Sequence, residues 1–530
     1  MPSSNDILYS KGKNDECFTP RYGVLPIVKY VAANWTVWCP FSQEDSEFVK
    51  VLREYGYKVI CSHIADGQDF YTYEPKEHWD CIIDNPPFCF DEQTEVYTYD
   101  GWKTYDKIKE TDKVLSVNPE TQELKWSNIS SINIIPYNDT MLTFNTKTLN
   151  LCVTPYHRMY AHSFNGDKAK LLKDKSINDL ISANNITPKS HKQMRSGYKW
   201  QGIEQTIFTL PKIIVNKGSG TEVCYEKNID MKHWVAFFGL WLADGYCRHT
   251  LNSQGNPRYT VGIKQDNNGW EYVRNILNKL PFDIKEYDEK GTNKKNFEIH
   301  SQQLWEYLIQ FGYSKNKFIP KEIKDLPCEY LQILLDSYLF GDSYLLKNKS
   351  IGINTISKQL SEDLQEIILK LGDVINFHSR DVICRGKDYG KIYVGYWNKG
   401  KMTNSKYPKP SSSQYKGIVW CPELQENGVM LCRRNETICF SGNTNKRLIF
   451  KRAMSFNKPF ALMFSMTWLN DAAPKEIFLE ENKQMQMLMF DKRIKFMNNG
   501  VVQNKITFST GYLCWDFLPK DIVCERLKIE

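Results

Sequence analysis

Three residues at two points of the chain are of the types that could cleave and rejoin a backbone. Cys89 follows Phe88 directly, and its thiol, with an ordinary pKa of about 8.5, can attack the preceding carbonyl. Asn443 can attack its own carbonyl through its side-chain amide, and the hydroxyl of Thr444 can take over an acyl group. The segment 89–443 could therefore leave while its two neighbours join.

A helper for the first step is expected in the stretch LCVTPYHRMYA. An amide carbonyl is a poor electrophile, so the peptide between Phe88 and Cys89 must be strained or protonated. Thr154 and His157 lie three residues apart, a spacing that can bring a hydroxyl and an imidazole to the same amide. We expect His157 to donate a proton to the departing nitrogen, as general acids do near neutral pH.

Two apolar helical stretches each end in a small residue and an aspartate. They are WVAFFGLWLADGY and YLQILLDSYLFGDSY, and the aspartates are Asp244 and Asp342. Gly239 and Ala243 in the first stretch would let another helix approach closely, which would bring both carboxylates to a shared end. Paired carboxylates are hard ligands for Mg²⁺, and such sites promote attack on phosphodiesters. Lys264, in VGIKQDN between the motifs, could assist near a phosphate, although a solvated strand lysine is the simpler interpretation.

A third group of candidates follows the strand-like run HWDCIID. Asn85, Pro86, Pro87 and Phe88 stand at the carboxyl end of this expected strand, where doubly wound parallel sheets bind their ligands. The prolines fix the backbone, so the Asn85 oxygen and the Pro86 carbonyl can point at one donor while Phe88 offers a face for stacking. An exocyclic amine on a stacked base would fit, and a tight turn after a strand is the plain alternative.

The elements around these residues are of two kinds. Before Cys89 and after Thr444, strand-like runs such as TVWCPF, KVICSHI and NKPFALMFSMTWL alternate with helical runs, which predicts a parallel doubly wound sheet. Short β-branched and aromatic runs from 89 to about 160, and again from Gly417 onward, predict an all-β unit. We expect five segments, 1–88, 89–229, 230–400, 401–443 and 444–530, with a Gly-, Lys- and Ser-rich return linker over residues 385–413.

The insert resembles the inteins, which are self-splicing protein domains. CFDEQTEVYTYDGWKTYDKI is similar to their first conserved block, LCVTPYHRMYA to the second, and VWCPELQENGVMLCRRNETICFSGNT to the closing blocks. The resemblance implies an all-β horseshoe that brings both junctions together, so that Thr444 can reach the thioester. Gly442 stands where a histidine usually assists cyclisation, and Cys421 where aspartate is commoner. Cys421 could be an accessory acyl acceptor or a small buried hydrophobe.

Within the insert, residues 230–400 resemble the LAGLIDADG homing endonucleases in their single-chain form. The two aspartate-ending stretches carry the likeness, with FIPKEI and INTISKQLSEDLQEIILKLG in support and Ser343 in place of the usual second glycine. The resemblance implies a monomeric α+β domain that binds double-stranded DNA with curved antiparallel sheets in the major groove. It also implies Mg²⁺ at Asp244 and Asp342.

The flanking segments resemble the DNA methyltransferases of phage or bacterial type that act on the amino group of a flipped-out base, usually adenine. Asn85 to Phe88 match the family's motif, Thr19 and Pro20 are similar to its cofactor-side motif, and Asp69 could meet the adenine of S-adenosyl-L-methionine. The usual glycine-rich loop is replaced by CPFSQEDSEF. The resemblance implies a split Rossmann-like α/β fold, to which VVQNKITFSTGYLCWDFL and DIVCERLKI would add an antiparallel ending.

Bulk properties agree with several domains. A chain of 530 residues is too long for one core and predicts about three or four. The formal charge of +7 is compatible with nucleic acid without requiring it. The 15 cysteines lack the pairwise spacing of a zinc site or a disulfide scaffold. With no basic, apolar leader and no apolar stretch of roughly 20 residues, we expect a reduced, cytoplasmic protein without a membrane span.

Two other interpretations stay open. The chain could be an intact methyltransferase whose insert recognises DNA, or the insert could splice while its endonuclease no longer cuts. Because neither flanking segment alone completes a sheet around the Pro-Pro turn, we expect little methyl transfer before splicing.

Overall fold

The computed structural model divides the chain into two compact units. It describes residues 19–44, 46–62, 68, 70, 73–85, 90–155, 157–165, 168–170, 181–183, 186, 188, 191–217, 220–251, 253, 255–384, 387–401, 403–425, 428–442, 446–466, 469, 473–494, 497–498, 501–502 and 509–528. The first unit comprises Met1–Thr121, Lys125–Gln193 and Ser405–Glu530, and the second Gln122–Leu124 and Met194–Asn404. The larger part of the second unit thus begins at residue 194, and it includes residues 194–229, which we expected in the splicing domain.

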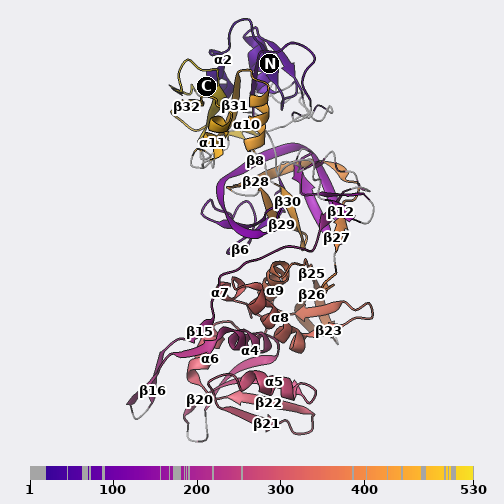
Figure 1. Cartoon of the computed structure of the whole chain (residues 1–530), viewed down its shortest axis with the longest axis vertical. Helices are drawn as coiled ribbons and strands as arrows, with labels where there is room; N and C mark the ends of the chain where they lie inside the picture. Colours follow the sequence, from indigo (N-terminus) through magenta and orange to yellow (C-terminus); the bar gives the residue numbers. More distant parts are fainter. Residues whose placement is uncertain are drawn as a thin grey trace, which may run out of the picture. The chain divides into compact units, whose positions relative to one another are not determined.

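In the first unit, the segments that flank the insert build one seven-stranded sheet (Figure 1). Its order is β2 (Lys58–Cys61), β1 (Thr36–Cys39), β3 (Cys81–Asp84), β31 (Phe460–Ser465), β35 (Thr510–Trp515), β32 (Gln486–Phe490) and β36 (Ile522–Glu525). Strands β2, β1, β3 and β31 are parallel, whereas β35 is antiparallel to both of its neighbours. The expected parallel pairing is confirmed for the first four strands.

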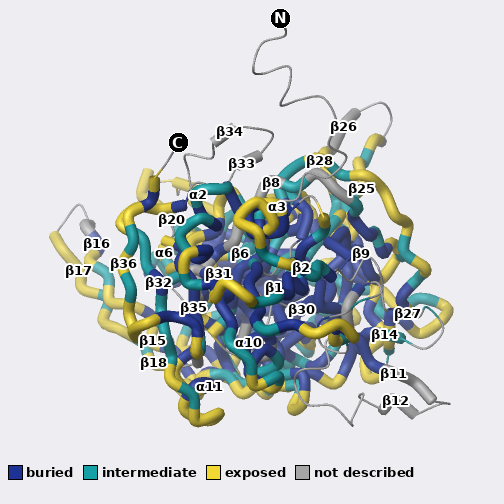
Figure 2. The backbone as a smooth tube through the Cα atoms, turned by 90° about the horizontal axis from the view of Figure 1, so that it is seen from above, coloured by how far each residue is buried: buried dark blue, intermediate teal, exposed yellow. Residues whose placement is uncertain are grey.

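Helices cover both faces of this sheet. Residues of α2 (Arg21–Val28) and α3 (Glu47–Glu54) pack with Val37 and Ile83 of the strands. Residues of α10 (Lys446–Ser455) and α11 (Ala473–Glu480) pack with the alternate positions, including Trp38 and Ile82. Strands covered on both faces are buried at successive positions, as β35 is from its first to its fifth residue (Figure 2).

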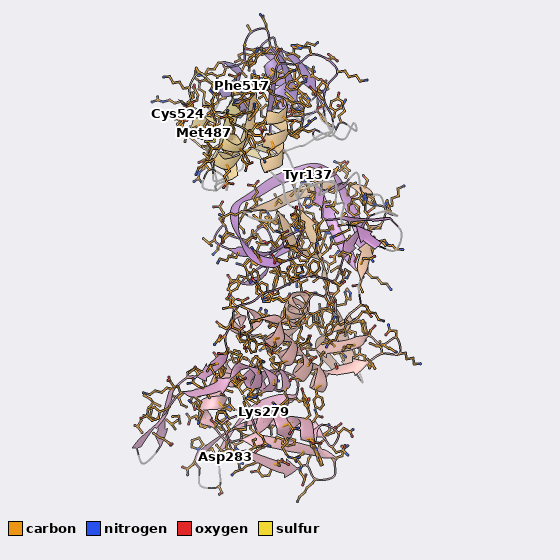
Figure 3. The ribbon with its side chains drawn as sticks, viewed as in Figure 1. Tyr137, Lys279, Asp283, Met487, Phe517 and Cys524 are labelled. Carbon is orange, nitrogen blue, oxygen red and sulfur yellow. The ribbon has the colours of Figure 1, made fainter. Side chains whose placement is uncertain are left out.

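The pairing across the insertion point changes one expectation. β3 precedes the insert and β31 follows it, yet Ile82 pairs with Phe460 and Asp84 with Leu462. The two flanking segments therefore share one sheet while the insert is present, which contradicts the incomplete sheet that we expected as the reason for low activity. The chain's last strand also differs from expectation, because β36 runs parallel to β32, with Met487 opposite Ile522. Figure 3 labels Met487 of β32 and Cys524 of β36.

The described residues next to both ends of the insert, Phe90 and Gly442, lie in a second, nine-stranded sheet of the same unit. It contains β4 (Phe90–Asp91), β5 (Glu95–Thr98), β6 (Gly101–Lys103), β7 (Lys113–Val117), β8 (Leu124–Thr146), β9 (Leu149–Val153), β28 (Ser411–Leu424), β29 (Val429–Arg434) and β30 (Thr437–Gly442). β8 is one strand of 23 residues where we expected several short ones, and β28 pairs with β8 along most of the length of β8. The all-β prediction is confirmed for these described segments.

Shorter strands surround the point where the second unit is inserted. β10 (Arg158–Met159) pairs with β13 (Ile181–Ser182), and a four-stranded sheet has the order β12 (Lys168–Lys170), β11 (His162–Asn165), β14 (His191–Met194), β27 (Asn404–Lys406). The chain leaves the first unit after Gln193 and returns at Ser405. Because β14 and β27 are neighbours, the second unit is inserted as a loop between two paired strands.

The second unit contains the same arrangement twice. The first copy is α4 (Met231–Asp244), β19 (Gly245–Leu251), β20 (Pro257–Asp266), α5 (Trp270–Leu277), β21 (Ile284–Asp288), β22 (Lys294–Ile299) and α6 (Gln302–Ile309). After α7 (Lys321–Lys324), the second is α8 (Cys328–Asp342), β23 (Ser343–Leu345), β24 (Ile351–Thr355), α9 (Lys358–Lys370), β25 (Phe377–Cys384) and β26 (Lys387–Trp397). The sheets have matching orders, β19-β20-β22-β21 and β23-β24-β26-β25, with all neighbours antiparallel.

Two hairpins, β15 (Ile207–Leu210) with β18 (Lys227–Asp230) and β16 (Ile213–Lys217) with β17 (Gly220–Cys224), precede the first copy. The expected return linker over residues 385–413 is wrong, because β26, β27 and the start of β28 occupy much of it. No helix in the described ranges is long and apolar enough to span a bilayer.

Candidate functional site

One buried imidazole in the first unit contacts a described residue near each end of segment 89–443. The His157 ring centroid lies 4.4 Å from that of Phe90, the residue after Cys89. His157 Nε2 lies 2.8 Å from the hydroxyl oxygen of Ser441, two residues before Asn443. A single side chain therefore touches both strands that lead to the two junctions.

The surroundings of His157 make its ring neutral. The residue is 1% exposed, and burial, aided by the positive charge of Arg158, lowers its pKa to about 3. The neutral ring carries one proton, so one nitrogen can donate and the other can accept. Nδ1 has no hydrogen-bond partner in the part of the chain that the structure describes. As an acid near pH 7, His157 could thus act only through the N–H of the neutral ring.

A tight turn holds this imidazole in place. The His157 N–H donates to the Thr154 carbonyl at 3.0 Å, and the Ala183 N–H donates to the His157 carbonyl at 2.9 Å. Thr154 and His157, which we expected to act on one amide, are both buried. Cys421 is also buried, on β28, with Sγ 3.6 Å from the Pro422 carbonyl oxygen. This position agrees with a small apolar side chain.

Gln193 fixes the strand that leads to the second junction. Its Nε2 donates to the Phe440 carbonyl at 2.6 Å, and its Oε1 accepts from the Phe440 N–H at 2.9 Å. The amide side chain therefore pairs with both backbone groups of Phe440, as a neighbouring strand would. The Gln193 Nε2 also donates to the Tyr407 hydroxyl at 3.0 Å, and that hydroxyl donates to the Tyr160 carbonyl at 2.8 Å. Sequence reasoning missed both residues: Gln193 lies outside the quoted motifs, and Ser441 lies within the quoted closing stretch, where no role was expected for it.

Seven of the residues that we expected to act lie outside the described residues. They are Asp69, Pro86, Pro87, Phe88, Cys89, Asn443 and Thr444. Within the insert, the described residue next to Cys89 is Phe90, which begins β4, and the one next to Asn443 is Gly442, which ends β30.

The described part of the DNPPF stretch is tied to two loops. The buried Asp84 carboxylate accepts from the Phe41 N–H at 2.6 Å and from the Ser42 hydroxyl at 2.7 Å, so it fixes the loop after β1. The Asn85 side chain donates from Nδ2 to Thr19 Oγ1 at 3.4 Å. Thr19 and Asn85, expected in the cofactor and base sites, therefore lie side by side. Pro20 precedes α2 as its N-cap residue.

In the second unit, α4 and α8 approach each other backbone to backbone (Figure 1). A Cβ added to Gly239 would lie 2.2 Å from the Leu334 carbonyl oxygen, so no larger residue fits there without a shift. A Cβ added to Gly341 would lie 2.5 Å from Asp244 Oδ2. Asp244 ends α4 and Asp342 ends α8. The two carboxylates therefore sit at the shared end of the helix pair.

Charge at this end is concentrated and partly buried. Burial raises the pKa of Asp342 to about 6, with a further increase from the negative charge of Asp244. Burial also raises the pKa of Asp244, while Lys317 opposes the change. The ammonium of Lys317 donates to the carbonyls of Trp241, Leu242 and Gly245 at 2.8–3.0 Å, where α4 ends. Burial lowers the pKa of Lys317 to about 8.

The two copies differ beside their aspartates. Ile263 pairs with Gly245 in the first sheet and Ile353 with Ser343 in the second, so Gln265 and Thr355 hold equivalent positions two residues further on. Gln265 Nε2 donates to Asp244 Oδ2 at 3.0 Å, whereas Thr355 Oγ1 accepts from the Ser357 N–H at 3.2 Å.

Lys264, Gln265 and Lys317 differ in what they contact. Lys264 forms an ion pair with Glu289 at 2.5 Å, as the simpler interpretation of this lysine predicts. Gln265 and Lys317, which do contact the aspartate end, were missed in the sequence. Only the quoted FIPKEI stretch, which follows Lys317 directly as FIP, pointed near either of them.

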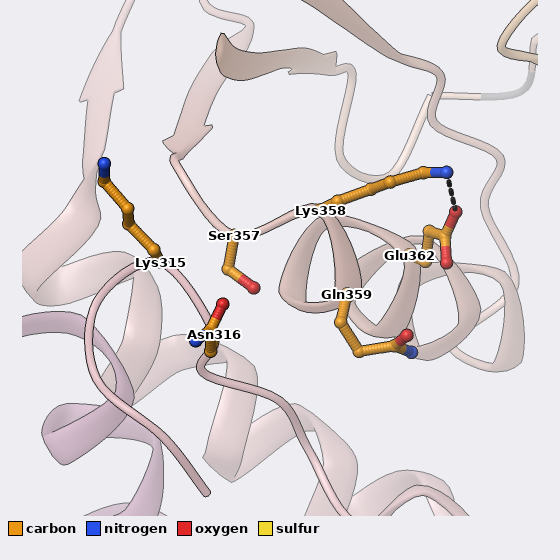
Figure 4. A pocket seen from close by; sticks show the side chains of 6 residues that line it. All are labelled: Lys315, Asn316, Ser357, Lys358, Gln359 and Glu362. Carbon is orange, nitrogen blue, oxygen red and sulfur yellow. Dashed lines mark ion pairs between the residues drawn. The ribbon is translucent and has the colours of Figure 1, made fainter. Parts of the chain in front are cut away.

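The donor set fits Mg²⁺. No group of three or more His, Cys, Asp or Glu side chains within the described ranges is arranged to hold a metal ion. Mg²⁺ commonly uses one or two carboxylates and takes its remaining ligands from water and substrate phosphates. Asp244 and Asp342 would supply the two carboxylates. A separate pocket of about 360 Å³ lies at the start of α9, lined by Lys315, Asn316, Ser357, Lys358, Gln359 and Glu362 (Figure 4). None of the expected site residues lines it.

No protein-family model matches the chain. It is similar to the ATP-dependent Clp protease proteolytic subunit of Chlamydomonas moewusii, with 26% identity over 301 residues that cover 55% of this chain and 28% of the relative. It is also similar to the DNA-directed RNA polymerase subunit beta C-terminal section of Stigeoclonium helveticum, with 24% identity over 427 residues that cover 68% of this chain and 37% of the relative. The chain therefore spans well under half the length of either curated relative.

Parts of the chain are similar in structure to homing endonucleases and to an intein. I-DmoI in complex with DNA and Mn matches 32% of this chain and 90% of its own, at 16% identity and a TM-score of 0.25. The homing endonuclease I-WcaI bound to its DNA recognition sequence matches 32% and 77%, at 16% identity and 0.22. The AceL NrdHF class 3 split intein matches 40% and 99%, at 12% identity and 0.17.

Proposed function

We propose that the chain is an unspliced precursor whose segment 89–443 excises itself and joins the flanking segments. The observation that carries this proposal is the contact of one buried imidazole, His157, with both Phe90 and Ser441. Residues far apart in the sequence but next to the two junctions thereby share one proton-handling group. Neutral imidazole in a dry site is suited to moving protons within the protein.

The proposed chemistry has four steps. The Cys89 thiol attacks the Phe88 carbonyl, a thioester forms, the peptide bond breaks, and the thiol proton ends on the freed amine of Cys89. The Thr444 hydroxyl then takes the acyl group from sulfur. The Asn443 side-chain nitrogen attacks its own carbonyl, closes a succinimide and releases the Thr444 amine, which finally displaces the ester to give a peptide bond. His157 carries this proton: the neutral ring donates its N–H proton to the nitrogen that departs in the first step and regains one proton, the one lost by the thiol, so that a single proton is transferred overall.

The two curated relatives support an insert that different proteins can carry. One bears the name of a protease subunit and the other that of an RNA polymerase subunit, yet each aligns with more than half of this chain. If the shared segment can move between genes, proteins with unrelated names are expected to carry it.

We also propose that the second unit is a site-specific DNA endonuclease. Two copies of one αββ-containing arrangement, each delivering one aspartate to a common end, suit the two strands of a duplex. Asp244 and Asp342 would hold Mg²⁺, which when bound stabilises negative charge on the phosphodiester oxygens. Gln265 orients Asp244, and Lys317 limits the repulsion between the two carboxylates. The antiparallel sheets would contact double-stranded DNA.

For the joined flanking segments we propose methyl transfer to the exocyclic amine of a DNA base. The support is a mostly parallel sheet whose β3 leads into Asn85, with Thr19 at 3.4 Å from the Asn85 amide. S-adenosyl-L-methionine, bound near Thr19, Pro20 and Asp69, would supply the methyl group. Before splicing, the insert follows Phe88 directly, so residues 85–88 are not joined in sequence to the segment that contains α10, and little methyl transfer is expected.

Mass spectrometry of the expressed chain tests the main proposal. Wild type should yield a released insert of residues 89–443 and a product in which residue 88 is joined to 444. Cys89→Ala together with Asn443→Ala should yield only the intact precursor. A wild-type chain that stays at full length under reducing, mildly basic conditions would favour the intact methyltransferase with a DNA-recognition insert. Incubation with DNA of the uninterrupted host gene and Mg²⁺ tests the endonuclease, and the absence of a cut with normal splicing would mark it as inactive.

A further inference from the structure

The second junction lacks a side chain that could handle protons at the residue before Asn443. Gly442 has none, and Ser441 is the next residue back along β30. Ser441 is fully buried, at 0% exposure, and its hydroxyl lies 2.8 Å from His157 Nε2. The two residues are 284 positions apart in sequence, so the contact exists only in the folded insert.

The direction of this hydrogen bond follows from counting partners. If Nε2–H donated to Ser441, the hydroxyl proton and the Nδ1 lone pair would both lack described partners in a dry site. If the Ser441 hydroxyl donates to Nε2, the ring proton sits on Nδ1, and only that N–H remains unpaired among the described residues. The second arrangement satisfies more buried polar groups and is therefore favoured.

We propose that Ser441 is a positioning residue that keeps the His157 proton on Nδ1, ready for the departing nitrogen of Cys89. This inference rests on the proposed splicing function. Nδ1 is the ring nitrogen that the described residues leave available, and the ring packs on Phe90, the residue bonded to Cys89. Because Ser441 belongs to the strand that ends next to Asn443, the first cleavage depends on correct placement of the second junction.

The tautomer gives a readout that a merely structural role for Ser441 would not change. The nitrogen chemical shifts of ¹⁵N-histidine in the Cys89→Ala precursor, assigned with His157→Gln, should give the neutral Nδ1–H form in this parent protein. With Ser441→Ala the His157 signals should move toward Nε2–H or a mixture, and Ser441→Thr should restore the parent pattern. An Nε2–H form in the parent protein, or unchanged shifts in Ser441→Ala, would overturn the inference.

Thiol-induced cleavage at the first junction provides the rate measurement. In an Asn443→Ala background, which blocks cyclisation, Ser441→Ala should slow the dithiothreitol-induced cleavage before Cys89 about tenfold, the effect of one hydrogen bond. Ser441→Thr should keep most of the rate. The matched control is Ser127→Ala, which removes a buried serine of β8 that bonds Ser116 and not His157.

The outcomes separate this inference from the function on which it rests. If the Asn443→Ala parent does not cleave, the proposed splicing function fails. If it cleaves and Ser441→Ala cleaves equally fast, only the role of Ser441 fails. Circular dichroism checks the fold of each variant, and should Ser441→Ala not fold, the tautomer of the parent protein and the rate of Ser441→Thr still decide.

Discussion

The two proposed reaction centres differ in how they hold charge. At the shared end of α4 and α8, two carboxylates and the Lys317 ammonium are gathered, and the pKa of Asp342 rises to about 6 because charge is costly there. Around His157, two described side chains that contact the ring, those of Phe90 and Ser441, are uncharged, and burial, aided by the positive charge of Arg158, keeps the imidazole neutral.

This difference matches the two chemistries. A centre that must hold a divalent cation gains from carboxylates whose mutual repulsion the cation relieves. A centre that moves a proton between groups of one chain needs no net charge, and a buried ion there would be costly. The following predictions test whether the two centres are independent and whether charge has opposite roles in them.

The largest effect is expected from His157→Ala. Loss of a positioned general acid should slow cleavage before Cys89 by about 10²–10⁴-fold, because the departing nitrogen then lacks its proton donor. The measurement is thiol-induced cleavage followed by gel densitometry. DNA cleavage by the same protein should be unchanged, and a parallel loss of both activities would contradict independent centres.

The converse variants, Asp244→Asn and Asp342→Asn, should abolish DNA cleavage and leave splicing intact. Removal of one carboxylate weakens Mg²⁺ binding and the stabilisation of phosphodiester charge, for a loss of at least about 10²-fold. Without metal the variants should also unfold at a higher temperature than wild type, because a partly buried charge is removed. Mg²⁺ should raise the Tm of wild type and not of the variants. Cleavage that survives in Asp244→Asn would refute the assigned site.

Lys317→Met tests whether the charge at the helix ends needs its buried cation. The change leaves the carbonyls of Trp241, Leu242 and Gly245 without their donor and the two aspartates without the opposing charge. It should cost roughly 3 kcal/mol of stability. Urea unfolding of the chain measures this, and Mg²⁺ should recover part of the loss. Lys315→Met, at an exposed position two residues away, is the matched control and should have little effect.

The His157 centre predicts a dependence on pH. Burial lowers the pKa of His157 to about 3 and that of His162 to about 4, both from an ordinary 6.5. For a base whose pKa falls on folding, the stability is complete above pH 6.5 and is lost as the pH falls below it, since the unfolded chain takes up the protons first. Between pH 6.5 and 5 each histidine should cost roughly 2 kcal/mol. Unfolding of wild type and His157→Gln at both pH values checks this, and equal slopes would contradict it.

From the sequence it was easier to predict the reactive residues than the residues that hold the reactive residues in position. The aspartate pair follows from helix ends and close-packing residues such as Gly239, which act locally and recur in both copies. Gln193, Ser441 and Lys317 act on partners 247, 284 and 76 residues away, respectively, and no local pattern marks such contacts. A sheet shared by the two flanking segments was predicted, but not that β3 and β31 would pair while the insert is present, because this pairing depends on the folded insert letting both strands meet.

The polar composition of residues 385–413 led us to predict a linker there, and this prediction was wrong for a related reason. Gly, Lys and Ser are common in linkers, but an antiparallel sheet with one solvated face tolerates them at its exposed positions. β26 pairs with both β24 and β25, so backbone hydrogen bonds, which composition does not report, decide its structure.

The smallest effects separate two adjacent residues of β20 and refine the picture of the charged centre. Gln265→Ala removes a hydrogen bond to the Asp244 carboxylate and should slow DNA cleavage about tenfold, the usual value of one bond to a charged group. Lys264→Ala removes an exposed ion pair with Glu289 on the other face of the strand, and exposed pairs contribute little, so both cleavage and Tm should stay near wild type. Single-turnover cleavage of a labelled duplex at saturating Mg²⁺ compares the two. If Lys264→Ala were the slower variant, this lysine would have a phosphate partner in the DNA complex, and the charged centre would extend beyond the aspartates, Gln265 and Lys317.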